Sequence, residues 1–431
     1  MTINLARKVT LSMAAVCLVL CLSSASFGYS VLTHQAIIDS TWEGHIKPLL
    51  LKRYPAANAE QLREAHAHAY GGAISQDMGY YPFGSRFYTD LTHYVRSGDF
   101  VEALVAESRD LNEYAFALGA LAHYAADNHG HSIGTNRAVP LVYPEIRAKY
   151  GDEVTYAEDP SSHIKLEFAF DVLQVARGRY APENYHDFIG FKVSKDVLAR
   201  AFKRTYSLEL KDVFGNLDLA LGTFRRTVST IIPEMTKVAW EMKEDEIEKA
   251  TPGITREKFV YNLSRADYEK EWGKQYEKPG FFAKSMAYFF RVMPKVGPFK
   301  ALDFRPPTPE AERFLMESFN ATLDRYRGLL GSMQAGRLNL DNRDLDTGRP
   351  VRAGEYPLAD EAYAKLVRKL ADKKLEGVTP DVRENILAFF SNLDAPIAVK
   401  RDKDDWRKTL RAIEVLRSTE ARAETVVNRD K

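Results

Sequence analysis

The histidines of this chain are concentrated in its first part, and their spacing restricts the possible folds more than any other feature. All ten lie within the first 186 of 431 residues. His123, Asp127 and His131 follow one another at intervals of four, which puts them on one stripe of a helix. His163 and Glu167 repeat this interval on a later segment. Because imidazole and carboxylate groups are the usual zinc ligands, two such stripes on facing helices predict a site for more than one metal ion.

The first 28 residues have the features of a secretory signal peptide. Two basic residues precede an apolar run from Val9 to Leu22, and Ser23–Gly28 supplies the small residues of a cleavage region. The apolar run is too short to span a membrane comfortably. We expect an exported protein, periplasmic or secreted. Cleavage after Gly28 would make Tyr29 its first residue, and a cut after Ala25 also fits the pattern.

Composition restricts the chemistry of the mature chain. Both cysteines, Cys17 and Cys21, lie in the predicted signal peptide, so any metal would be held by nitrogen and oxygen ligands alone. The 60 Lys and Arg residues nearly balance the 59 Asp and Glu residues. This balance gives no electrostatic reason to expect general affinity for nucleic acid or for an anionic membrane.

The hydrophobic pattern is helical along most of the chain, and alternating strand patterns are scarce. Gly71–Gly72 is expected to end the second helix, and Gly119 with its neighbouring alanines would allow close packing. The predicted helices are Ser30–Lys52, Ala56–Ala69, one or two within Phe100–His131, one that starts at Asp159-Pro160, Ser194–Tyr206, Leu210–Glu248, Pro309–Ser332, Ala359–Lys374, Pro380–Leu393 and Asp404–Ser418.

The character of the chain changes after residue 250. Thr251–Gly253 and Glu277–Gly280 interrupt the helical pattern, and Arg305–Pro309 is a stiff turn. We therefore expect a signal peptide at 1–28, a helical domain with the histidine pattern at 29–250, and a helical C-terminal extension of unknown role at 251–431.

The order of the ligand-type residues resembles the zinc-dependent phospholipase C family, which is structurally related to exported single-strand-specific nucleases of the S1/P1 type. The resembling pieces are Tyr29…Thr33-His34, Gln76-Asp77…Tyr81-Pro82, His93-Tyr94, His123-Tyr124-x-x-Asp127, His131 and His163-x-x-x-Glu167. The resemblance implies an all-α fold, a phospholipase C/P1 nuclease-like helical bundle, here with an α-helical C-terminal extension.

The resemblance also implies a cluster of about three zinc ions. One ion would be bound by Asp77, His93, His123 and Asp127, and a second by His131, His163 and Glu167. The third would be bound by the α-amine and carbonyl of Tyr29, by His34 and by the second oxygen of Asp127 as a bridge. Asp77 would also be the candidate general base.

Three departures from the family pattern bear on these assignments. Tyr29 stands where the family has tryptophan, which is compatible with ligation by the backbone. Ile133 occupies the position of the next family histidine, so His131 or His129 must replace it. We expect His131, because it shares the helical face of Asp127. The region after residue 250 has no counterpart in the family pattern.

Other polar residues have interpretations that need no metal. His45, His66 and His68 are expected to be half-exposed polar residues. Asp171 follows the second helical pair by one turn and is either a residue that orients a histidine or a solvated acid. Asp341–Gly348 resembles a calcium loop but has glycine and arginine at unsuitable positions, so we expect a surface loop.

The function that the resemblance implies is hydrolysis of a phosphodiester by metal-activated water. Our first expectation is phospholipase C action on glycerophospholipids, at a membrane surface. One alternative is an S1/P1-type nuclease or nucleotidase on the same fold, with single-stranded nucleic acid as substrate. Another is a non-catalytic cell-envelope protein whose zinc ions are structural. No protein partner is implied.

Overall fold

The computed structural model describes residues 31–177, 179–180, 191–228, 232–250, 252–253 and 303–427. The predicted signal peptide and Tyr29 lie outside these residues. Within them the chain forms helices and no β-strand; Arg343 and Pro350 form one isolated antiparallel bridge. The predicted all-α fold is therefore confirmed.

Most helices of the histidine-bearing part are short, and three of the turns between them are π-helical or 3-10 segments. In chain order the elements are α2 (Val31–Thr41), the π-helical turn η1 (Trp42–Ile46), α3 (Lys47–Arg53), α4 (Ala59–Ile74), the 3-10 turn η2 (Ser75–Tyr80), α5 (Arg86–Tyr94), α6 (Ser97–Glu107), α7 (Leu111–His129), the π-helical turn η3 (Gly130–Thr135), α8 (Asn136–Val142), α9 (Pro144–Tyr150), α10 (Pro160–Ala176), α11 (Lys195–Tyr206), α12 (Leu210–Val213), α13 (Leu217–Arg226) and α14 (Ile232–Ala250).

The C-terminal part contains longer helices. They are α18 (Pro309–Gln334), α19 (Pro357–Asp372), α20 (Pro380–Phe389), the 3-10 turn η7 (Ala398–Arg401) and α21 (Lys403–Val427). Side-chain caps set several of the helix starts: Thr308 accepts from the N–H of Ala311, and Thr379 accepts from the N–H of Val382.

Helices α4 and α7 pack closely at the centre of the molecule, through glycine. A Cβ atom on Gly72 would lie 1.9 Å from the carbonyl oxygen of Phe116, and one on Gly119 would lie 2.0 Å from that of Ala69. The expected end of the second helix at Gly71–Gly72 is wrong, because α4 continues to Ile74. Packing against α7 outweighs the helix cost of glycine, about 1 kcal/mol per residue.

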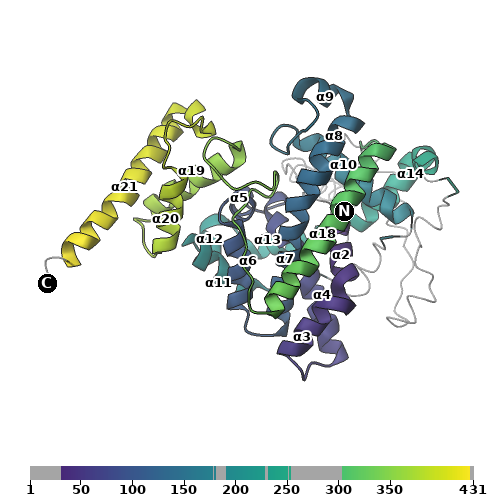
Figure 1. The fold of residues 1–431 in the computed structure, drawn as a ribbon, viewed down its shortest axis with the longest axis horizontal. Coiled ribbons are helices and arrows are strands. Elements are labelled where there is room, and N and C mark those ends of the chain that lie inside the picture. Colours follow the sequence, from purple (N-terminus) through teal and green to yellow (C-terminus); the bar gives the residue numbers. More distant parts are fainter. Residues whose placement is uncertain are drawn as a thin grey trace, which may run out of the picture.

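Among the C-terminal helices, α18 and α19 contact the helices of the histidine-bearing part (Figure 1). Helix α18 runs along α7, η3 and α8, and helix α19 packs against α5. Helices α20 and α21 pack on α19 and lie away from the central helices. The segment between α18 and α19 therefore passes close to α5 and α7, which carry predicted metal ligands. Among the described helices none is long and apolar enough to cross a membrane.

Candidate metal centre

The fold brings eight of the nine predicted ligands together at its centre; Tyr29 lies outside the described residues. These residues are almost completely buried, each at most 2% exposed. They come from six elements: His34 from α2, Asp77 from η2, His93 from α5, His123 and Asp127 from α7, His131 from η3, and His163 and Glu167 from α10. Seven of them form two groups whose ligand atoms lie within 4.8 Å of one another: Asp77, His93, His123 and Asp127; and His131, His163 and Glu167.

Asp127 faces different histidines with its two carboxylate oxygens. Its Oδ2 atom lies 3.1 Å from Nε2 of His123 and 3.3 Å from Nε2 of His93. Its Oδ1 atom lies 3.4 Å from Nε2 of His34. Asp77 completes the first group, with Oδ1 3.3 Å from Nε2 of His93. This arrangement is the one that a carboxylate needs in order to bridge two metal ions.

Backbone carbonyl groups orient three of the histidines. The bonded pairs are His93 Nδ1 with Thr89 O at 2.9 Å, His123 Nδ1 with Ala73 O at 2.9 Å, and His163 Nε2 with Val154 O at 2.7 Å. Because a carbonyl oxygen only accepts, the bonded ring nitrogen carries the hydrogen, and the other nitrogen of a neutral ring presents a lone pair. In each case that second nitrogen faces the carboxylates. The Ala73 bond also depends on the close packing of α4 against α7.

The second group forms around Glu167. Its Oε1 atom lies 3.7 Å from Nδ1 of His131 and 4.0 Å from Nδ1 of His163. His131 also lies between the two groups, with Nε2 4.0 Å from Oδ2 of Asp127. It sits on the π-helical turn η3, which begins directly after α7 and has a geometry often found at functional sites. His129 is in neither group, so the geometry favours His131, as expected.

The donor atoms of the centre fit a divalent metal. Seven buried atoms make no hydrogen bond within the described part of the chain: Asp77 Oδ1, both oxygens of Asp127, both oxygens of Glu167, and Nδ1 of His131 and of His163. Buried polar atoms without partners cost free energy, and native proteins rarely leave so many in one place. Nitrogen and carboxylate oxygen are the donors that zinc takes when no thiolate is present. Zinc would satisfy these atoms together.

The protonation states of the histidines and of Glu167 are set by burial and by the neighbouring carboxylates. Burial lowers the pKa of His34 to about 4 and that of His163 to about 3, so both rings are neutral, as metal ligands must be. Burial lowers the pKa of His93, but the neighbouring carboxylates of Asp127 and Asp77 outweigh this effect and hold the pKa well above its usual range. Burial and the charge of Asp127 raise the pKa of Glu167 well above its usual value. The centre therefore attracts positive charge, which protons or metal ions supply.

Asp171 is not a solvated acid, so that interpretation is wrong, while its role in orienting a histidine stays a prediction. Its carboxylate is fully buried and accepts hydrogen bonds from the start of α2, at 3.0 Å from the backbone N of Leu32 and 2.8 Å from Oγ1 of Thr33. Sequence reasoning also mistook His66, which is buried, stacks on Trp42 and lies 3.1 Å from Asp39. The partners of Asp171 and of His66 lie far from them in the sequence, so local spacing cannot predict these contacts.

The expected surface loop at Asp341–Gly348 is in part an interior segment. Asp344 and Asp346 are buried, and the backbone N–H of Leu345 donates to the carbonyl oxygen of His93 at 3.2 Å. The hydroxyl of Tyr94 donates to Oδ2 of Asp346 at 2.8 Å. The segment thus supports the α5 end that carries His93. Its buried carboxylates accept hydrogen bonds from tyrosine hydroxyl groups and from backbone N–H groups. The acidic pattern that resembles a calcium loop therefore serves to attach this segment to the protein interior.

Comparison with known proteins agrees with this geometry. Residues 33–216 match the family model described as zinc dependent phospholipase C, and the matched range contains all eight residues of the centre. The comparisons with curated proteins and with solved structures gave no match. The family and the two buried groups both support zinc as the metal. Over residues 33–216 this chain is therefore similar to the zinc-dependent phospholipase C family.

Proposed function

We propose that this protein is an exported zinc phosphodiesterase that hydrolyses glycerophospholipids as a phospholipase C, with about three zinc ions per chain. The observation that carries the proposal is the pair of buried histidine and carboxylate groups that meet at Asp127 within the family segment. Export is supported by the signal-like residues 1–28. A phospholipid is the substrate class that the family suggests.

The geometry of the groups supports the proposed ligand sets. One ion would be held by Asp77, His93, His123 and Asp127, and a second by His131, His163 and Glu167. A third would be held by His34, by Oδ1 of Asp127, and by the backbone of Tyr29 at the processed N-terminus. The separate directions of the two Asp127 oxygens support this bridge.

The chain would contribute positioning and proton transfer to the reaction. When bound, zinc ions polarise a phosphodiester, lower the pKa of water and stabilise the leaving oxygen. Asp77 accepts the proton of the attacking water through a carboxylate with an unpartnered oxygen. The oxygen of water forms the new bond to phosphorus as the bond to the diacylglycerol oxygen breaks, and that oxygen takes up a proton. The carbonyl groups of Thr89, Ala73 and Val154 hold the imidazoles in place.

The test uses the exported full chain, with its N-terminus determined and its zinc content measured by elemental analysis. Phosphatidylcholine vesicles and single-stranded DNA are supplied as substrates, and diacylglycerol and acid-soluble nucleotides are measured. Asp77→Asn should lose at least about 100-fold in turnover. The control Asp324→Asn, on a side chain 80% exposed on α18, should retain it.

Each outcome separates the proposed function from its alternatives. Diacylglycerol release that depends on Asp77 supports the phospholipase C assignment. Cleavage of DNA with intact vesicles would replace it by a nuclease assignment on the same fold. Full zinc occupancy without turnover of either substrate would point to structural zinc and would overturn the enzyme assignment.

A further inference from the structure

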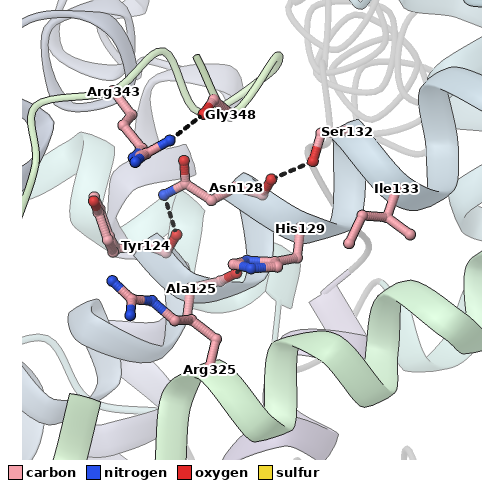
Figure 2. Close-up of a pocket in the computed structure, with 9 residues that line it drawn as sticks. All are labelled: Tyr124, Ala125, Asn128, His129, Ser132, Ile133, Arg325, Arg343 and Gly348. Atoms are coloured by element: carbon pink, nitrogen blue, oxygen red, sulfur yellow. Dashed lines mark hydrogen bonds between the residues drawn. The ribbon is translucent and has the colours of Figure 1, made fainter. Parts of the chain in front are cut away.

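A polar cavity lies beside α7, at the end of the helix that continues into η3 (Figure 2). Its volume is about 470 Å³, within the range of small-molecule sites. Three segments that are distant in sequence enclose it: the end of α7 with η3, the middle of α18, and the chain from Arg343 to Gly348. None of its lining residues belongs to either histidine and carboxylate group.

The helix itself separates the two sites. Tyr124 and Asn128 line the cavity, while His123 and Asp127, their neighbours in sequence, face the metal centre. Successive residues of an α-helix are about 100° apart, so the two pairs point to different sides. The cavity therefore has its own chemistry and is not the mouth of the metal centre.

Two guanidinium groups give the cavity a positive wall. Two of the donor groups of Arg343 are already used: Nη1 donates to the carbonyl of Gly348 at 2.7 Å, and Nη2 donates to Oδ2 of Asp341 at 2.8 Å. Arg325 makes no hydrogen bond and no ion pair with any described residue, although it lines the same space from α18. No carboxylate is among the lining residues. An arginine fork with free donors matches a phosphate or carboxylate group.

The α7 side of the cavity offers hydrogen-bond acceptors. Asn128 is 7% exposed, and its Nδ2 donates to the carbonyl of Tyr124 at 2.7 Å, whereas its Oδ1 has no hydrogen-bond partner in the described chain. His129 Nδ1 lies 3.0 Å from the carbonyl of Ala125 and therefore carries the ring hydrogen, which leaves the Nε2 lone pair of the neutral ring as an acceptor. A ligand that satisfies this wall must carry hydroxyl or other donor groups.

We propose that this cavity binds the phosphate monoester of a small polyol, with the phosphate against Arg325 and Arg343 and the hydroxyl groups toward Asn128 and His129. The cavity is too large for a bare phosphate ion, and the acceptors beside the two guanidinium groups suit a hydroxylated ester better than an all-anionic ligand. The ester is either a soluble sugar or glycerol phosphate, or the headgroup of a lipid. This site is independent of the proposed phospholipase activity.

The test measures binding of sn-glycerol 3-phosphate to the zinc-loaded full chain by isothermal titration calorimetry at 0.15 M salt. Arg325→Gln should weaken binding about tenfold or more, because charge-assisted hydrogen bonds are lost. Arg327→Gln is the matched control, since Arg327 lies on the same helix, pairs with Asp324 at 3.3 Å and does not line the cavity. Zinc content and melting temperature of both variants should equal those of the wild type.

A parallel titration with vesicles that carry a phosphate monoester headgroup identifies the source of the ligand. Arg325-dependent binding of glycerol 3-phosphate supports a soluble ester, and Arg325-dependent binding of the vesicles alone supports a lipid headgroup. Equal affinities of the wild type and Arg325→Gln for both probes would overturn the proposal, and so would equal losses in the two arginine variants. If binding is kept in Arg325→Gln but lost when zinc is removed, the ester binds at the metal centre, and this result would also overturn the proposal.

Discussion

Asp171 accepts a hydrogen bond from the backbone N–H of Leu32, at 3.0 Å and across 139 positions of the chain. Its other oxygen accepts from the hydroxyl of Thr33 at 2.8 Å. The first N–H groups of a helix have no partner within the helix, and this carboxylate supplies one for α2. Asp171 thereby ties α10, which carries Glu167, to the start of α2, which carries His34.

Replacement of Asp171 by alanine should destabilise the protein and disturb the site around His34. We expect a loss of about 1–3 kcal/mol in the free energy of unfolding, because buried donors lose their acceptor. Urea denaturation measures this loss, and elemental analysis should show a reduced zinc content. Asp171→Asn keeps one acceptor oxygen and should fall between the wild type and the alanine variant. Unchanged stability and zinc content in both variants would contradict a positioning role.

Asp127→Asn should remove two zinc ions together. A bridging carboxylate serves two ions with its two negatively charged oxygens, and the neutral amide offers neither ion an anionic oxygen. His34→Ala should remove only one ion, because His34 lies 3.4 Å from Oδ1 of Asp127 and belongs to neither of the two other ligand sets. Zinc stoichiometry of the purified variants decides between these cases. A loss of only one ion in Asp127→Asn would show that Asp127 does not bridge.

Gly119→Ala should destabilise the contact between α4 and α7. A methyl group at this position would lie 2.0 Å from the Ala69 carbonyl, so the helices must separate, at a cost of about 1–3 kcal/mol. Separation also weakens the bond from His123 to Ala73, so zinc affinity should fall. Gly328→Ala is the control, because its added methyl group meets nothing within 4 Å. That control should gain about 0.5–1 kcal/mol in a helix interior. Thermal unfolding with and without zinc measures both effects.

Asp344 should make the stability of the protein fall as the pH rises. Burial, with the charge of Asp346, raises the pKa of Asp344 to about 8. Between the ordinary carboxyl range and pH 8 the folded state keeps a proton that the unfolded state has released, so the free energy of unfolding decreases with rising pH. The decrease is at most about 1.4 kcal/mol per pH unit for this group.

Urea denaturation at pH 5, 7 and 9 measures this dependence in the wild type and in Asp344→Asn. The amide does not ionise and can still accept from the N–H of Asp346, so the variant should show a shallower decrease. Asp324→Asn, on an exposed side chain, should follow the wild type. Parallel curves for the wild type and Asp344→Asn would contradict the assignment to Asp344.

The metal groups could be predicted because much of their geometry is local. Intervals of four put His123 with Asp127, and His163 with Glu167, on one face of their helices whatever the rest of the chain does. The resemblance then supplied Asp77, His93 and His34, and the structure brings these side chains to the same centre. The choice of His131 over His129 also followed from helical spacing, although the π-helical turn itself was not foreseen.

The sequence therefore determined the helical class and the ligand pairs at intervals of four, since both follow from side-chain types at fixed spacings, and the remaining candidate ligands came from the family resemblance. The tertiary structure decided the partners of Asp171, the burial of His66, the contact of Leu345 with His93, and the cavity beside Asn128. Each of these depends on segments tens to hundreds of residues apart, and their meeting is set by packing across the whole core. No local pattern encodes such contacts, because the same residues would be solvated if another helix lay against them.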